Sequence, residues 1–144
     1  MGEFFMKPPD ELQRELVQQW LDKANEDFDV AVMLLREGGR YRGVIAFHAQ
    51  QAVEKYLKAF LVRHQFDFPK THDIGRLLDR IAMVDPIAAA GLSGSDILTP
   101  YGVEVRYPSD APELLPGEDV EAVEVARQTR EQVLNLLSPY LNGT

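Results

Sequence analysis

Polar side chains recur along one line of an otherwise apolar helical segment, residues 46 to 61. This polar row is formed by His48, Gln51 and Lys55, and Lys58 extends it by one turn. Gln50 and Glu54 form a second pair beside it. His48, Gln51 and Lys55 are spaced three and four residues apart, so they share one face of a helix with 3.6 residues per turn. An imidazole, a carboxamide and an ammonium side by side form either a polar binding site or a buried polar interface.

Histidine and arginine together could cleave RNA without a metal. The reaction needs a base for the ribose 2′-hydroxyl, an acid for the leaving oxygen and a cation for the charge on phosphorus. His48 could exchange protons near neutral pH, and Arg42 or Arg106 could hold a phosphate with two hydrogen bonds. A second copy of the chain could supply the second histidine. The catalytic candidates are therefore Arg42, His48 and Arg106.

The same residues also have purely structural interpretations. A single histidine on a helix more often serves packing than catalysis, and His48 and Arg106 could serve packing, dimer contacts or ligand binding. Glu54 could neutralise Arg106 or Lys55 inside the protein, because a buried charge needs a partner. Both interpretations stay open on the sequence.

Further ligand-binding candidates lie later in the chain. His72 precedes a predicted helix whose first amides could hold an anion, or it could anchor a loop. Tyr101 and Tyr107 flank Arg106 and could stack on a base, or they could plug one end of the fold. Together with the polar row, the ligand-binding candidates are His48, Gln51, Glu54, Lys55, Lys58, His72, Tyr101, Arg106 and Tyr107.

Two long helices must position the polar row. Apolar residues at three- and four-residue spacing predict an amphipathic helix from Asp10 to Glu37, which Gly38 and Gly39 end. The same spacing predicts a second helix from about Tyr41 to Gln65, which carries the row.

Shorter elements follow, and one long helix ends the chain. Thr71 or Asp73 could cap a third helix, and Asp85-Pro86 a fourth. Thr99-Pro100 predicts a cap that opens a short turn through Val103. A last helix is expected from about Glu118 to Leu141, broken or capped near Pro139. Since no alternating strand pattern is present, we expect an all-α fold, an antiparallel up-and-down bundle of four or five helices.

Composition narrows the possible functions. The chain of 144 residues predicts one domain, and we assign residues 10–141 to it. Residues 1–9 are expected to be disordered or vector-derived, and whether residues 1–5 are native stays open. The net charge of −8 argues against a broad nucleic-acid surface. Clustered arginines and lysines between residues 36 and 63 leave a local basic pocket possible.

The residue types also limit cofactors and location. The absence of cysteine excludes disulfides, thiolate catalysis and cysteine-bound zinc. Three scattered histidines give no metal-ligand spacing, so we expect neither a metal nor another cofactor. No apolar run is long enough to cross a bilayer. We therefore expect a cytoplasmic protein without membrane contact.

Three segments resemble the HEPN family over roughly residues 15 to 140. The most specific is Gln50-Gln51-Ala52-Val53-Glu54-Lys55, followed by Lys58-Ala59. Thr71-His72-Asp73-Ile74 and the segment from Tyr101 to Arg106-Tyr107-Pro108 follow in the expected order. The resemblance implies a small helical bundle that usually dimerises and is similar to the substrate-binding domain of kanamycin nucleotidyltransferase.

The resemblance also implies partners and an activity. Members are often encoded beside a minimal nucleotidyltransferase as a toxin and antitoxin pair, and many are metal-independent ribonucleases with an Arg, four to six residues, then a His. Arg42 and His48 match this spacing, but they open the second helix, whereas the family's catalytic pair usually belongs to a later one. Arg106-Tyr107-Pro108 corresponds better in position, and no histidine follows it.

Two functional hypotheses follow. In the favoured one, the chain is a dimeric nucleotide-binding or partner-binding module that contacts a minimal nucleotidyltransferase through His48, Gln51, Lys55 and Arg106. In the other, it is a metal-independent ribonuclease toxin. The chain is not itself the transferase, because no Asp-x-Asp pair follows Gly94-Ser95; the pair Asp27 and Asp29 lies upstream on a predicted helix.

Overall fold

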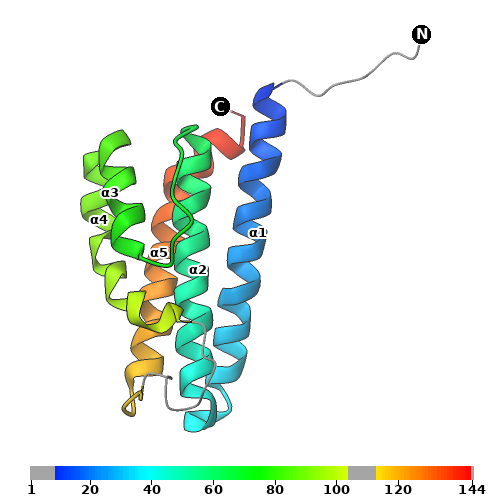
Figure 1. The fold of residues 1–144 in the computed structure, drawn as a ribbon. Coiled ribbons are helices and arrows are strands. Elements are labelled where there is room, and N and C mark those ends of the chain that lie inside the picture. The colour runs from blue at the N-terminus through cyan, green and yellow to red at the C-terminus, as the bar shows by residue number, and fades with distance from the viewer. Residues whose placement is uncertain (1–8, 104–112, 144) are drawn as a thin grey trace.

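The computed structural model describes residues 9–103 and 113–143, and within them it is built of helices alone (Figure 1). The α-helices are α1 (Pro9–Leu35), α2 (Arg42–Arg63), α3 (Ile74–Val84), α4 (Pro86–Leu92) and α5 (Glu118–Leu141). Two 3₁₀ segments are η1 (Gly38–Tyr41) and η2 (Ser93–Gly102). The prediction of an all-α helical bundle is confirmed.

Helix α2 is the centre of the bundle. It packs against α1, α5, α3 and η2, and α3 and α4 lie on its far side from α1 (Figure 1). The largest fully buried side chains include six of its residues, among them Tyr56, Leu57 and Phe60. Because other elements surround it, α2 buries apolar residues on several faces. Its polar side chains therefore either pair with groups inside the protein or lie where α2 reaches the surface.

The connection from α2 to α3 runs back along α2 before α3 begins (Figure 1). It returns His72, at its far end, to the middle of α2, where the Gln50 amide donates a hydrogen bond to the His72 carbonyl, at 3.1 Å. The sequence indicates no such return, since it depends on contacts between residues more than twenty positions apart.

Most predicted helix ends lie within two residues of the observed ones. Asp73 caps α3 by accepting from the Gly75 amide, and Asp85 caps α4 by accepting from the Ala88 amide. Gly38 has a φ of 76° just after α1, a conformation that glycine adopts without a Cβ clash. Each of these residues acts on backbone groups a few positions away, so the helix ends that they mark can be predicted from the sequence.

Two predicted boundaries are wrong. Thr99 lies inside η2 instead of opening a turn, and its hydroxyl accepts from the Ile74 amide at 3.1 Å, so it ties η2 to the start of α3. Helix α5 is not broken near Pro139 but continues to Leu141. Arg14 of α1 donates to the Tyr140 carbonyl at 3.1 Å, and this contact together with the packing of Tyr140 and Leu141 on the core favours the helical ending.

A polar contact crosses the centre of the bundle at Tyr56. Its hydroxyl donates to Asn25 of α1, and the same oxygen of Asn25 accepts from Arg130 of α5 at 3.2 Å. The Tyr56 side chain is fully buried, and this burial raises the pKa of Tyr56 above its ordinary value of 10.0. The phenol therefore stays protonated in the folded protein where it would ionise in the unfolded chain.

The stability of the wild-type protein is expected to fall as the pH rises above about 10, because the unfolded chain then loses the Tyr56 proton and the folded protein keeps it. Tyr56→Phe should remove this part of the pH dependence while costing about 1 kcal/mol at neutral pH. Urea unfolding at pH 8 and pH 10.5 measures both effects. An equally steep alkaline loss in Tyr56→Phe would contradict the assignment, and Tyr41→Phe serves as a control at a partly exposed tyrosine.

Candidate ligand- and partner-binding site

Asp27 of α1 joins two members of the predicted polar row. Its Oδ1 lies 2.9 Å from Nδ1 of His48, and its Oδ2 accepts from the Lys55 ammonium. The side chains of His48 and Lys55 are each 27% exposed and that of Asp27 is 13% exposed. The row therefore continues across α1 and α2 as a cluster that is held by internal contacts and still reaches the surface.

Glu54, the residue before Lys55 on α2, holds a second polar cluster. Its side chain is 2% exposed and accepts from the Gln51 amide at 2.7 Å. His72 Nδ1 lies 3.2 Å from both carboxylate oxygens, and Lys58 Nζ lies 3.8 Å from one of them. Glu54 therefore fixes the returning connection against α2.

The predicted pairing of Glu54 with Lys55 is wrong. Consecutive residues of a helix point about 100° apart, so Glu54 points toward the returning connection while Lys55 points toward Asp27 of α1. Gln51 donates to Glu54 and to Gln50 at 2.8 Å, so its amide belongs to the Glu54 cluster.

Arg42 and His48 contact different helices. Arg42 Nε lies 3.8 Å from Oδ1 of Asp119 in α5, whereas His48 contacts Asp27 in α1. The six-residue spacing explains this result, because it turns the two side chains to different sides of a helix. The geometry of the described residues does not bring the Arg42–His48 pair together, and Arg106 and Tyr107 lie outside those residues.

Several of the clustered basic side chains have partners inside the chain. Lys58 Nζ lies 5.6 Å from the Trp20 ring centroid and 5.7 Å from that of Phe68, in addition to its contact with Glu54. The Arg63 guanidinium lies 4.0 Å from the Tyr140 ring centroid. These cations stabilise the fold through cation–π contacts, so they do not form an open basic pocket.

Tyr101 is half-buried and packs against the core. Burial raises its pKa, and the nearby carboxylates of Glu118 and Glu121 raise it further. Its neighbour Gly102 faces the Gln50 amide, because a Cβ at Gly102 would lie 2.5 Å from Gln50 Nε2. The end of η2 at Gly102 therefore packs directly against Gln50 of α2.

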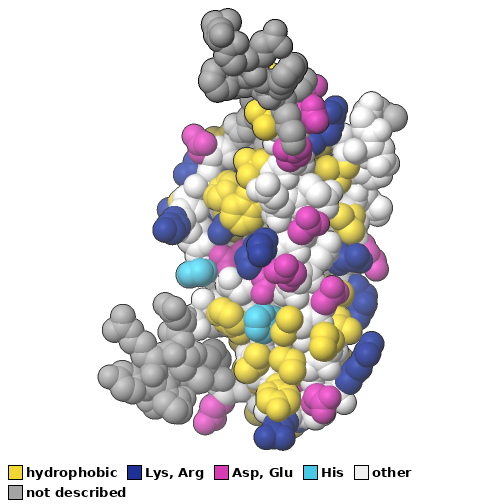
Figure 2. All heavy atoms as spheres, turned by 90° about the vertical axis from the view of Figure 1, so that its right-hand side faces the viewer, with side chains coloured by type: hydrophobic (Ala, Val, Ile, Leu, Met, Phe, Trp, Pro, Cys, Tyr) yellow, Lys and Arg dark blue, Asp and Glu magenta, His cyan; other side chains and the backbone are white. Residues whose placement is uncertain are grey.

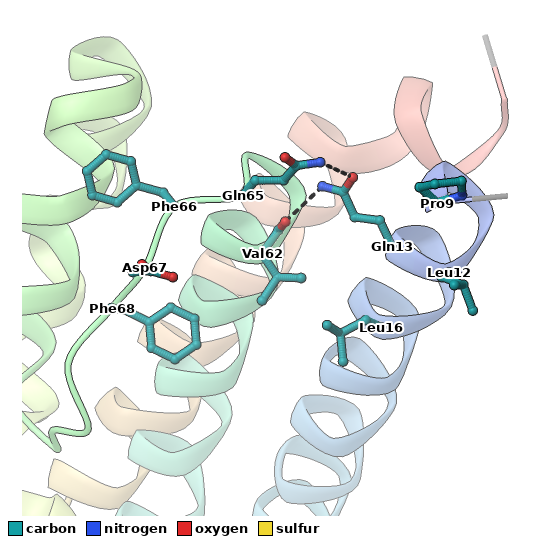
Figure 3. Close-up of a pocket in the computed structure, with 9 residues that line it drawn as sticks. All are labelled: Pro9, Leu12, Gln13, Leu16, Val62, Gln65, Phe66, Asp67 and Phe68. Carbon is teal, nitrogen blue, oxygen red and sulfur yellow. Dashed lines mark hydrogen bonds between the residues drawn. The ribbon is translucent and has the colours of Figure 1, made fainter.

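An open groove of about 520 Å³ lies between the start of α1, the end of α2 and the returning connection (Figure 3). It is lined by Pro9, Leu12, Gln13, Leu16, Val62, Gln65, Phe66, Asp67 and Phe68. Gln13 crosses it, donating to the Val62 and Arg63 carbonyls at 2.9 and 2.6 Å. None of the predicted ligand-binding residues lines this groove, and the exposed side chains of Leu12 and Leu16 form part of its α1 wall.

Asp27 is the residue of the candidate site that sequence reasoning missed. Its distance of 21 residues from His48 hides the contact, because only the packing of α1 on α2 brings them together. One signal in the sequence could have revealed it: Asp27 places a carboxylate on a partly apolar side of the long first helix, and such a group needs a partner when it is buried.

The described residues contain no group of three or more His, Cys, Asp or Glu side chains that could hold a metal ion. Within the same part of the chain, no helix is both long and apolar enough to cross a bilayer.

The fold and the site define a class: an all-helical bundle with polar clusters on its central helix. The HEPN domain model matches residues 17–139, which is most of the chain, so the chain belongs to the HEPN family. This membership supports a nucleotide- or RNA-related module in general. A search of curated proteins and a search of solved structures each gave no match, and the likeness to kanamycin nucleotidyltransferase stays a prediction.

Proposed function

We propose that this chain is a HEPN-domain module that binds a nucleotide or a partner protein on the face formed by α1 and α2. The observation that carries the proposal is the Asp27–His48–Lys55 cluster, which is held in place from inside and partly exposed. We further propose that the module forms a homodimer, resides in the cytoplasm and works with a minimal nucleotidyltransferase as a toxin and antitoxin type of pair.

The surface around the cluster supports binding. Val44 lies one turn before His48 on the same side of α2 and is 46% exposed, and Phe47 beside it is half-buried. Figure 2 shows hydrophobic side chains gathered around a histidine on this face, with charged side chains next to them. Mixed apolar and polar surfaces of this kind are typical of binding interfaces.

His48→Ala is expected to weaken the binding of ATP by about tenfold, because one directed hydrogen bond from the protein is lost. Isothermal titration calorimetry of the full chain with ATP measures this change. Lys23→Ala is the matched control, since Lys23 lies on α1, is 66% exposed and pairs only with Glu26 among the described contacts. Undetectable ATP binding by the wild type, or equal binding by His48→Ala, would contradict a nucleotide site at this cluster.

One observation favours a metal-independent ribonuclease as a second candidate function. His48 is partly exposed, and its Nδ1 contacts a carboxylate, which leaves Nε2 available for proton transfer. Labelled single-stranded RNA incubated with the protein in chelator separates the two candidates. Cleavage that is lost in His48→Ala or Arg106→Ala would establish the ribonuclease, whereas intact RNA favours the binding module.

A further inference from the structure

We propose that Asp27 is a positioning residue that fixes His48 as a hydrogen-bond acceptor for a ribose hydroxyl of the bound nucleotide. The inference rests on the proposed function and names the part of the ligand that this site recognises. Asp27 belongs to α1 and lies 21 residues before His48 in the sequence.

The contact with Asp27 determines which nitrogen of His48 carries the proton. An ionised carboxylate can only accept hydrogen bonds, so at 2.9 Å from Asp27 Oδ1 the His48 Nδ1 must be the donor. In the neutral imidazole the other nitrogen is then an acceptor. Nε2 has no hydrogen-bond partner among the described residues, and the side chain is 27% exposed.

Lys55 makes this arrangement stable. Its ammonium donates to the second oxygen of Asp27, so both carboxylate oxygens have donors and the carboxylate is held between α1 and α2. Asp27 thus orients the imidazole in the same way that a carboxylate orients a metal-binding or catalytic histidine from behind.

The charges of the cluster favour a neutral ligand group. The positive charge of Lys55 already faces Asp27, so it does not attract a phosphate as an isolated ammonium would. An imidazole Nε2 without a proton accepts a hydrogen bond, and phosphate oxygens cannot donate one when ionised. The ribose hydroxyls of a ribonucleotide are neutral donors of this kind, and the exocyclic amine of adenine is another. Nucleosides with and without the hydroxyls separate the two.

The protonation of His48 can be tested without any ligand. Long-range proton–nitrogen correlation NMR of the full chain at about pH 8.5, about two units above the ordinary histidine pKa, should show His48 with its proton on Nδ1. Asp27→Asn should keep this form, because its amide oxygen still accepts. Asp27→Ala should shift the proton to Nε2, and Asp29→Ala, at an exposed position of the same helix, should not.

A His48 proton on Nε2 in the wild type would overturn the role of Asp27, even if Asp27→Ala failed to fold. If a folded Asp27→Ala protein still carried the His48 proton on Nδ1, the role of Asp27 would be overturned as well.

Nucleosides test the ligand group. Adenosine should shift the His48 ring signals, and 2′,3′-dideoxyadenosine, which lacks both hydroxyls, should bind at least about tenfold more weakly. Equal binding of the two nucleosides would overturn the ribose assignment while leaving the nucleotide-binding function intact. If neither adenosine nor ATP binds but His48 carries its proton on Nδ1, the nucleotide-binding part of the proposed function fails together with the ribose assignment, and the orientation by Asp27 stands.

Discussion

Glu54→Ala is expected to lower the free energy of unfolding by about 3–5 kcal/mol, since removing one member of a buried charged cluster leaves its partners unpaired. The Glu54 side chain is 2% exposed, and its carboxylate accepts from Gln51 and contacts His72 and Lys58. Its loss also releases the returning connection from α2. Urea unfolding at neutral pH measures the change.

Two further variants separate charge from shape at this position. Glu54→Gln keeps the size of the side chain and part of its hydrogen bonding, so it should cost about 1–3 kcal/mol. Glu124→Ala, which removes an exposed carboxylate paired with Arg127, should change the free energy by about 0–1 kcal/mol. A cost for Glu54→Ala as small as that for Glu124→Ala would show that the cluster does not stabilise the fold.

Gly102→Ala is expected to lower the free energy of unfolding by about 2–4 kcal/mol, through overpacking and the loss of a buried hydrogen bond. The new Cβ would lie 2.5 to 2.8 Å from the end of the Gln50 side chain. Gln50 is fully buried and donates to the His72 carbonyl, so it cannot move aside without breaking that bond.

The matched control for this prediction lies in the same 3₁₀ segment. A Cβ at Gly94 would meet nothing within 4 Å, so Gly94→Ala should leave the free energy of unfolding nearly unchanged. Thermal unfolding of both variants compares them directly. Equal melting temperatures for Gly102→Ala and the wild type would show that the Gln50 amide adapts and that the returning connection does not depend on it.

Residue types and their spacing are enough to predict the helices and most of their ends. Apolar spacing acts along a single helix, and caps such as Asp73 and Asp85 act on amides two or three residues away, so both can be recognised locally. Pro139 and Thr99 were misinterpreted for the opposite reason. The helix continues past Pro139 where Arg14 donates to the neighbouring Tyr140 carbonyl, and Thr99 contacts the Ile74 amide; Arg14 and Ile74 both lie far away in the chain.

Part of the site was also predictable. The polar row of α2 follows from residue type and helical spacing, and the motif that resembles HEPN proteins predicted the family that the domain match then confirmed. Arg106 and Tyr107 lie outside the described residues, so their predicted roles stay predictions.

The pairing of the polar side chains depends on how the helices pack in three dimensions. It assigned Lys55 to Asp27, separated Arg42 from His48, and brought His72 back to Glu54. Helical spacing gives the direction of each side chain relative to its own helix, but the partner depends on which neighbour packs there. Since α1, α5 and the returning connection each cover a different side of α2, three-dimensional packing chose the partner of each polar group.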